Sequence, residues 1–235
     1  MKKIITTLAA LTVLSTSYTV SASEWSYSGE TAPTNWHGTC QSGVNQSPID
    51  ITHAIESTLD PIIFNYSKAG KNVVNNGHTV QVNFDVKQSI QIEGKTFTLL
   101  QLHFHAPSEN LIEGHSFPLE MHLVHADKDG NLAVIGVMLK EGKPNSELTK
   151  IWAKMPQSGQ VDLENQLDLT KLLPRDQAYY RFNGSLTTPP CSEGVTWLVM
   201  KNPIEISSEQ LAQFTALYNG NNRPTQAINA RPILK

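Results

Sequence analysis

Short runs of alternating apolar and polar residues dominate the chain, and they predict a protein built mainly from β-strands. A period of two places successive side chains on opposite faces of a strand. Turn signals such as Asp129-Gly130 separate the runs, which is typical of antiparallel sheets. We therefore predict a mainly β (α+β) fold, a single domain with a large, mostly antiparallel central sheet. The predicted strands are residues 80–86, 89–92, 96–105, 120–125, 132–139, 179–182, 195–200 and 203–206.

Helical periodicity occurs in few segments, so the predicted helices are short and peripheral. One spans residues 147–154 behind Ser146 as its cap, and another follows Ser207, whose spacing to Gln210 fits a capping box. Their apolar stripes are predicted to be core: Leu148, Ile151, Trp152 and Met155 in the first helix, and Leu211, Phe214 and Leu217 in the second.

The first 22 residues are predicted to be a secretory signal peptide. Lys2 and Lys3 precede an apolar stretch from residue 4 to about 13, and cleavage is expected after Ala22. That stretch is too short to span a membrane comfortably, and no later segment resembles a span. No linker or repeat divides residues 23–235, which we predict to be one exported domain, periplasmic or secreted.

Charge argues against nucleic acid as a partner. The formal net charge is −3, and it becomes −5 once Lys2 and Lys3 are removed with the signal peptide. No basic cluster is present, whereas nucleic-acid-binding proteins carry one. The sequence leaves the choice between monomer and homodimer open.

The chain has two cysteines, Cys40 and Cys191. In an oxidising compartment we expect an isolated pair to form a disulfide. Two unpaired buried thiols are the alternative, because sequence alone does not show that the Cα atoms lie close enough. Neither cysteine has the spacing of a zinc site.

Two predicted strands carry histidines that could converge. His103 and His105 share a face with Gln101 in residues 98–105, and His122 shares a face with Glu120 in residues 119–125. If the opposite, apolar faces of both strands contact the same core, the three imidazoles meet. Three neutral nitrogen ligands with an open fourth position are typical of catalytic zinc. The apolar faces comprise Leu100, Leu102 and Phe104 in one strand and Leu119, Met121 and Leu123 in the other.

A His-x-His pair on a strand has a simpler interpretation, a solvated polar face. The neighbours of the histidines favour the metal. Gln101 and Glu120 each precede a histidine by two residues on the same face, where they could hold the second ring nitrogen of a ligand.

Several motifs in one order then identify a family resemblance. They are residues 45–50 (NQSPID), 75–78 (NNGH), 101–105 (QLHFH), 120–125 (EMHLVH), 185–190 (SLTTPP) and 221–224 (NNRP). From about Trp25 to the C-terminus the chain resembles the α-class carbonic anhydrases, in particular the exported bacterial members.

The resemblance implies a zinc enzyme that catalyses the reversible hydration of carbon dioxide to bicarbonate and a proton, through attack by a hydroxide held on zinc. It makes His103, His105 and His122 the zinc ligands. Gln101, Glu120 and the main chain of Asn221 become the partners of their other ring nitrogens. Sulfonamides and small anions are the expected inhibitors.

Further roles follow from the same resemblance. Thr187 is expected to orient the nucleophile while Glu109 accepts its hydroxyl proton, and His78 is expected to shuttle protons. Without the resemblance, we would interpret Glu109 as a surface carboxylate and His78 as a turn residue. Tyr27 and Asn76 are assigned to the water along the proton path, Thr188 is placed beside bicarbonate, and the apolar wall for carbon dioxide comprises Val124, Val134, Leu186, Val195 and Trp197.

Two other functions are weighed against hydration. A non-catalytic carbonic-anhydrase-like binding module would keep the fold for adhesion, but such modules typically lose a ligand histidine. A zinc hydrolase is disfavoured because no His-Glu-x-x-His motif is present.

Overall fold

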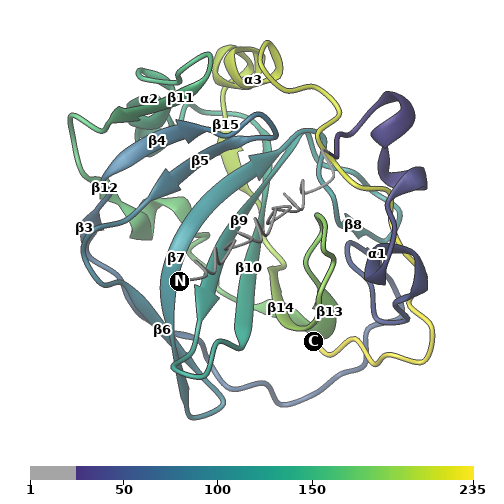
Figure 1. Ribbon diagram of the computed structural model, residues 1–235. Helices are drawn as coiled ribbons and strands as arrows, with labels where there is room; N and C mark the ends of the chain where they lie inside the picture. The colour runs from purple at the N-terminus through teal and green to yellow at the C-terminus, as the bar shows by residue number, and fades with distance from the viewer. Residues whose placement is uncertain (1–24) are drawn as a thin grey trace, which may run out of the picture.

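The computed structural model describes residues 25–235, and the predicted signal peptide lies outside the described residues. An eleven-stranded sheet runs through this part of the chain (Figure 1). Its main path follows the order β11-β4-β5-β7-β9-β10-β14-β13, with β6 and β2 continuing from β7 and β15 pairing with β10. The strands are β1 (Asp50–Ile51), β2 (Ile63–Asn65), β3 (Lys68–Ala69), β4 (Asn72–Asn75), β5 (Val80–Asn83), β6 (Ser89–Ile92), β7 (Lys95–His105), β8 (Leu111–Ile112), β9 (Leu119–Ala126), β10 (Leu132–Glu141), β11 (Gly159–Asp162), β12 (Leu167–Asp168), β13 (Tyr179–Ser185), β14 (Glu193–Met200) and β15 (Ile204–Ile206).

The predicted mainly β architecture is confirmed, with one refinement: the sheet is mixed. Most neighbouring strands are antiparallel, but β10 pairs in parallel with β14 and with β15. Parallel neighbours need a long crossover. Residues 142–192, which separate β10 from β14 and include a helix and β13, supply that connection.

Each of the eight predicted strands is present, and the differences lie at the ends and in the short elements. Residues 84–86 were predicted to continue β5, which ends at Asn83. Strand β4 was missed because its sequence, Asn-Val-Val-Asn, does not alternate. Its strand structure comes from pairing with β5 and β11 on either side.

A bulge in β7 corrects the predicted apolar face of that strand. Its register against β9 shifts between Leu99 and Gln101. A bulge inserts one residue and reverses which side chains face the core. Leu100 was predicted to share the core face with Leu102 and Phe104, but it is 48% exposed, whereas Leu99 is 4% exposed. Beyond the bulge the predicted alternation holds, and Leu102 and Phe104 are fully buried.

The helices lie at the periphery, as predicted. They comprise α1 (Thr39–Ser42), α2 (Ser146–Trp152) and α3 (Ser208–Thr215), with the 3-10 turns η1 (Gly29–Thr31), η2 (Pro33–Asn35) and η3 (Leu169–Leu172). The capping box of α3 forms between Ser207 and Gln210. The cap of α2 was predicted one residue too late, because the side chain of Asn145 accepts from the main-chain N–H groups of Glu147 and Leu148. None of the helices within residues 25–235 is long and apolar enough to span a membrane.

Strand β9 is covered on both faces, and this places the histidine face inside the protein. Leu119, Met121 and Leu123 belong to the larger apolar core. On the opposite face, Val124 belongs to a second apolar cluster with Val134 and Trp197. The face that carries His122 is therefore not a solvated surface.

Candidate metal centre and active site

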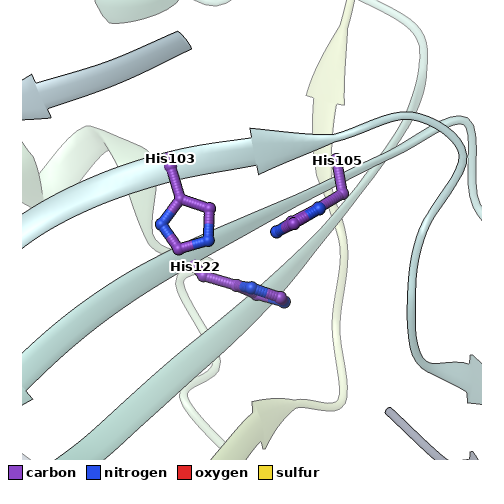
Figure 2. Close-up of side chains that lie close together, drawn as sticks. All are labelled: His103, His105 and His122. Carbon is purple, nitrogen blue, oxygen red and sulfur yellow. The ribbon is translucent and has the colours of Figure 1, made fainter. Parts of the chain in front are cut away.

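Strands β7 and β9 bring the three predicted histidines together. The register of this antiparallel pair places His103 directly opposite His122, and His105 lies two residues further along β7. Figure 2 shows the three rings close together, with His103 and His105 on β7 and His122 on β9. One nitrogen of each ring lies within 4.8 Å of the others. A single ion could contact all three.

A different kind of acceptor stands beside the second nitrogen of each ring. Nδ1 of His103 lies 2.8 Å from Oε1 of Gln101, and Nδ1 of His105 lies 2.7 Å from the main-chain oxygen of Asn221. Nε2 of His122 is 3.0 Å from Oε1 of Glu120, although the direction is outside the range of a hydrogen bond. These contacts leave Nε2 of His103, Nε2 of His105 and Nδ1 of His122 to face the common centre.

The carboxylate of Glu120 is itself held from three sides. Its Oε2 accepts from the main-chain N–H groups of Glu109 and Asn110, both at 2.8 Å. Its Oε1 accepts from Nδ2 of Asn110 at 2.8 Å. Burial raises the pKa of Glu120, and the side-chain bond from Asn110 opposes that rise. Asn110 is a supporting residue that the sequence reasoning did not identify.

Burial keeps the imidazoles neutral, which is the form that binds metal. The pKa values of His103 and His122 lie well below the ordinary value, chiefly because burial disfavours the charged ring and then because neighbouring imidazoles repel a positive charge. Burial lowers the pKa of His105 to about 4.

The donor set fits a zinc ion. Nε2 of His105 is buried without a hydrogen-bond partner anywhere in residues 25–235. A buried polar atom without a partner is costly, and a cation would satisfy it. Three neutral imidazoles that converge on one point, each with an acceptor beside its other nitrogen, are the donors that zinc uses in catalytic sites.

Glu109 lies beside this centre and is fully buried. Its Oε1 accepts from the main-chain N–H of Arg223 at 2.8 Å, and its Oε2 is 3.5 Å from Nε2 of His105. Oε2 has no aligned donor among the described residues. Burial raises the pKa of Glu109 well above its ordinary value, while the N–H of Arg223 and the nearby Thr187 hydroxyl act to lower it. The structure thus brings Glu109 and Thr187 together.

His78 stands at the cavity that leads to the metal centre. It lies in the turn between β4 and β5, and its ring stacks on Trp25 with 3.7 Å between ring centroids and 11° between planes. A cavity of about 120 Å³ is lined by His78, Tyr27, Asn76, Thr188 and two of the three histidines. Burial lowers the pKa of His78 and raises that of Tyr27. Trp25 is a contact that sequence reasoning missed.

The predicted apolar wall forms one cluster beside His122. Val124, Val134, Val195 and Trp197 are buried members of that cluster, and Leu186 packs against it partly buried. The ring of Trp197 meets His122 edge-on at 4.9 Å between centroids. An apolar surface therefore borders the side of the centre that β9, β10 and β14 provide.

Cys40 and Cys191 form a disulfide with 4.9 Å between their Cα atoms. The main-chain N–H of Cys191 donates to the carbonyl oxygen of Thr188 at 2.8 Å. The carbonyl oxygen of Cys40 accepts from Nη2 of Arg223 at 2.7 Å. The disulfide thus joins the loop that carries Thr187 and Thr188 to α1.

Fold and site together place three histidines on a mixed sheet where they could hold one metal ion, and comparison with known proteins identifies the family. The family model for eukaryotic-type carbonic anhydrases matches residues 31–235. This chain therefore belongs to the α-carbonic anhydrase family.

Individual relatives agree with this assignment. A carbonic anhydrase of Klebsiella pneumoniae is 46% identical over 92% of this chain and 93% of its own length. The α-carbonic anhydrase of Thermovibrio ammonificans, solved in complex with the inhibitor sulfanilamide, is 46% identical with a TM-score of 0.88, covering 90% of this chain and 99% of that one. The α-carbonic anhydrase of Photobacterium profundum is 49% identical with a TM-score of 0.87, covering 90% of this chain and 100% of its own.

Proposed function

We propose that this chain is a zinc-dependent carbonic anhydrase, catalysing the reversible hydration of carbon dioxide to bicarbonate and a proton. The observation that carries the proposal is the convergence of three imidazole nitrogens within 4.8 Å of one another, in a chain of this family. His103, His105 and His122 would hold the zinc ion. When bound in a three-histidine site of this family, zinc lowers the pKa of water to roughly 7 and so supplies hydroxide near neutral pH, a family property rather than a result of this structure.

Gln101, Glu120 and the Asn221 carbonyl orient the ligands. In our proposal Gln101 and Asn221 accept the Nδ1–H of His103 and His105, and Glu120 faces Nε2–H of His122. Each acceptor fixes the tautomer of its imidazole, so that the lone pair of the other nitrogen points to the ion.

Thr187 and Glu109 orient the attacking oxygen. A hydroxyl has one proton to donate, and Glu109 Oε2 is an acceptor with no other aligned donor. If Thr187 donates there, its oxygen can only accept a hydrogen bond from the nucleophile, which turns a lone pair toward carbon dioxide. A nearby divalent cation favours the carboxylate form of Glu109 that this arrangement needs.

The two sides of the centre have different tasks. Val124, Val134, Leu186, Val195 and Trp197 bound the apolar side, where an uncharged substrate is accommodated, and Thr188 is a polar neighbour for bicarbonate. On the other side His78 receives the released proton across the cavity, and Tyr27 and Asn76 order the water between them. An imidazole suits this transfer because its pKa lies close to ambient pH.

The location and the inhibitors belong to the same proposal. Residues 1–22 would be a cleaved signal peptide and residues 23–235 the catalytic domain, acting in the periplasm or outside the cell. The disulfide Cys40–Cys191 supports an oxidising compartment. We expect sulfonamides to inhibit the enzyme, since a 46% identical relative was solved with sulfanilamide.

The decisive experiment combines metal content with stopped-flow hydration of carbon dioxide. Metal-free protein should gain activity on addition of one equivalent of zinc, and sulfanilamide should remove it. His122→Ala, which lacks one ligand, is the matched control and should bind zinc weakly. A wild-type rate no higher than that of His122→Ala would contradict the proposal and favour a non-catalytic binding module.

A further inference from the structure

The side chain of Asn221 joins two functional segments. Its Nδ2 donates to the main-chain oxygens of His78, at 3.1 Å, and of Phe104, at 3.0 Å. Its Oδ1 accepts from the main-chain N–H of Ala106 at 2.8 Å. Phe104 separates the two histidines of β7, so this amide bridges the strand of the metal centre to His78, which lines the same cavity.

We infer that the side chain of Asn221 positions His78 for proton transfer by fixing the turn of His78 against β7. This role is separate from that of the Asn221 carbonyl, which faces His105. The inference rests on the proposed role of His78 as the proton acceptor.

The turn needs such an attachment because its own bonds do not fasten His78 to the sheet. The side chain of Asn76 accepts from the N–H groups of His78 and Thr79, which shapes the turn internally. The pairing of β5 with β7 begins only at Gln81. Thr79 Oγ1 donates to the oxygen of Phe104 at 2.5 Å, which anchors the residue after His78.

The bond from Asn221 acts on the main chain of His78 itself. Asn221 is 3% exposed and its amide is committed on both atoms. A buried, fully bonded amide holds its partners in one geometry, because any shift leaves a polar group unpaired. The amide of Asn221 fixes the main chain of His78, and the stacking of Trp25 fixes its ring.

Position matters here because the proton crosses water before it reaches the imidazole. Such transfer requires a chain of hydrogen-bonded water at set spacing, so a small displacement of the acceptor slows it steeply. The attack on carbon dioxide occurs at the metal centre and does not depend on where His78 stands. We call the hydrogen bond from Asn221 Nδ2 to the main-chain oxygen of His78 the tether. Its loss should thus slow the proton step more than the hydration step.

The test separates these two steps by kinetics. In zinc-loaded enzyme and dilute buffer, kcat reports proton transfer and kcat/KM reports attack on carbon dioxide. Asn221→Ala keeps the main-chain carbonyl and removes the tether. We expect kcat to fall about fivefold, with a change in kcat/KM of less than about twofold, and imidazole buffer should restore part of kcat. Asn222→Ala, whose side chain makes no hydrogen bond within residues 25–235, is the neighbouring control.

A double-mutant cycle shows whether Asn221 acts through His78. His78→Ala alone should lower kcat about tenfold or more, and Asn221→Ala should have no further effect in that background. An independent readout is the NMR signal of the His78 ring protons, which the current of the Trp25 ring shifts. In Asn221→Ala these signals should move toward the values of an unstacked imidazole, with or without zinc.

The outcomes are distinct. If His78→Ala leaves kcat unchanged, the proposed role of His78 fails, and this inference fails with it. If His78→Ala lowers kcat but Asn221→Ala does not, or lowers kcat/KM equally, the tether is only structural. Asn221→Ser keeps a small polar side chain at this buried position but is too short to reach the main-chain oxygen of His78, so it decides the matter should the alanine variant not fold. Failure of both variants to fold would also overturn the positioning role.

Discussion

At the scale of single residues, the metal centre depends on three unlike acceptors. An amide, a main-chain carbonyl and a carboxylate stand beside the three imidazoles. An anionic acceptor makes an imidazole a stronger electron donor than a neutral one does. His122 lies beside the anionic acceptor, Glu120. Removal of this acceptor should therefore weaken metal binding more than removal of either neutral acceptor would.

Thr187 gives the sharpest single-residue prediction for catalysis. Thr187→Ala should lower kcat/KM for hydration about a hundredfold, the size of effect seen when one oriented hydrogen bond to a reacting group is lost. Thr187→Ser keeps the hydroxyl and should retain most of the activity. Stopped-flow rates of both variants at matched zinc content check this, and native activity in Thr187→Ala would disprove the orienting role.

His125 gives a prediction for the pH dependence of stability. It faces away from His122, as its strand position predicts, and is fully buried. Its Nε2 lies 2.7 Å from the hydroxyl of Tyr66, and burial lowers its pKa to about 4. Between pH 6.5 and 4 the unfolded chain binds a proton here that the folded protein does not.

This residue should therefore contribute its full stabilisation above pH 6.5 and lose it as the pH falls to 4. The lost free energy of unfolding is about 3 kcal/mol. In His125→Gln the slope of unfolding free energy against pH should be smaller in that window, measured by urea denaturation. Tyr66→Phe keeps the imidazole and should keep the slope. Equal slopes in wild type and His125→Gln would count against this account.

At the scale of elements, regular strands were predictable and interruptions of regularity were not. The long strands β7, β9 and β10 follow from alternation, since a half-buried strand requires it. The bulge at Leu100 has no such signal, because Leu99 and Leu100 are both apolar. The cap of α2 was misplaced by one residue because Asn145 and Ser146 are both good caps, and only the path of the chain decides between them.

The bulge predicts opposite outcomes for two adjacent leucines. Leu99→Ala should lower the free energy of unfolding by about 3 kcal/mol, because it leaves a cavity in the core. Leu100→Ala should change it by less than about 0.5 kcal/mol, because that side chain is half exposed. Denaturant titration of the two variants checks this, and equal losses would argue that β7 runs without the bulge.

At the scale of the whole molecule, the disulfide joins distant parts of the chain. Cys40 and Cys191 are 151 residues apart in sequence. In the chain-entropy model, closing a loop of that length stabilises the folded state by about 5 kcal/mol. Replacing both cysteines by alanine should lower the free energy of unfolding by up to that amount, as should reduction of the wild type. Unfolding curves that coincide with and without reductant would contradict this.

The three histidines and their neighbours Gln101 and Glu120 were predictable from the sequence, whereas several other supports of the site were not. Strand alternation alone brought His103, His105 and His122 together, because their relation is local to two strands. Arg223 and Trp25 reach the site across long separations, and Asn110 lies in a loop before β8, so pattern reasoning has no period that connects these residues to the site. The hydrogen bond from the main chain of Arg223 to Glu109 spans 114 residues.

The short segment 221–223 has a consequence for how the enzyme matures. It follows every strand of the main sheet, yet it contacts His105, the turn of His78 and Glu109. A growing polypeptide that has already formed β7 and β9 would carry all its ligands but none of these late contacts. Catalytic competence should consequently arise only after synthesis has passed Arg223, so that nascent chains stalled before Asn221 are inactive even when zinc is plentiful.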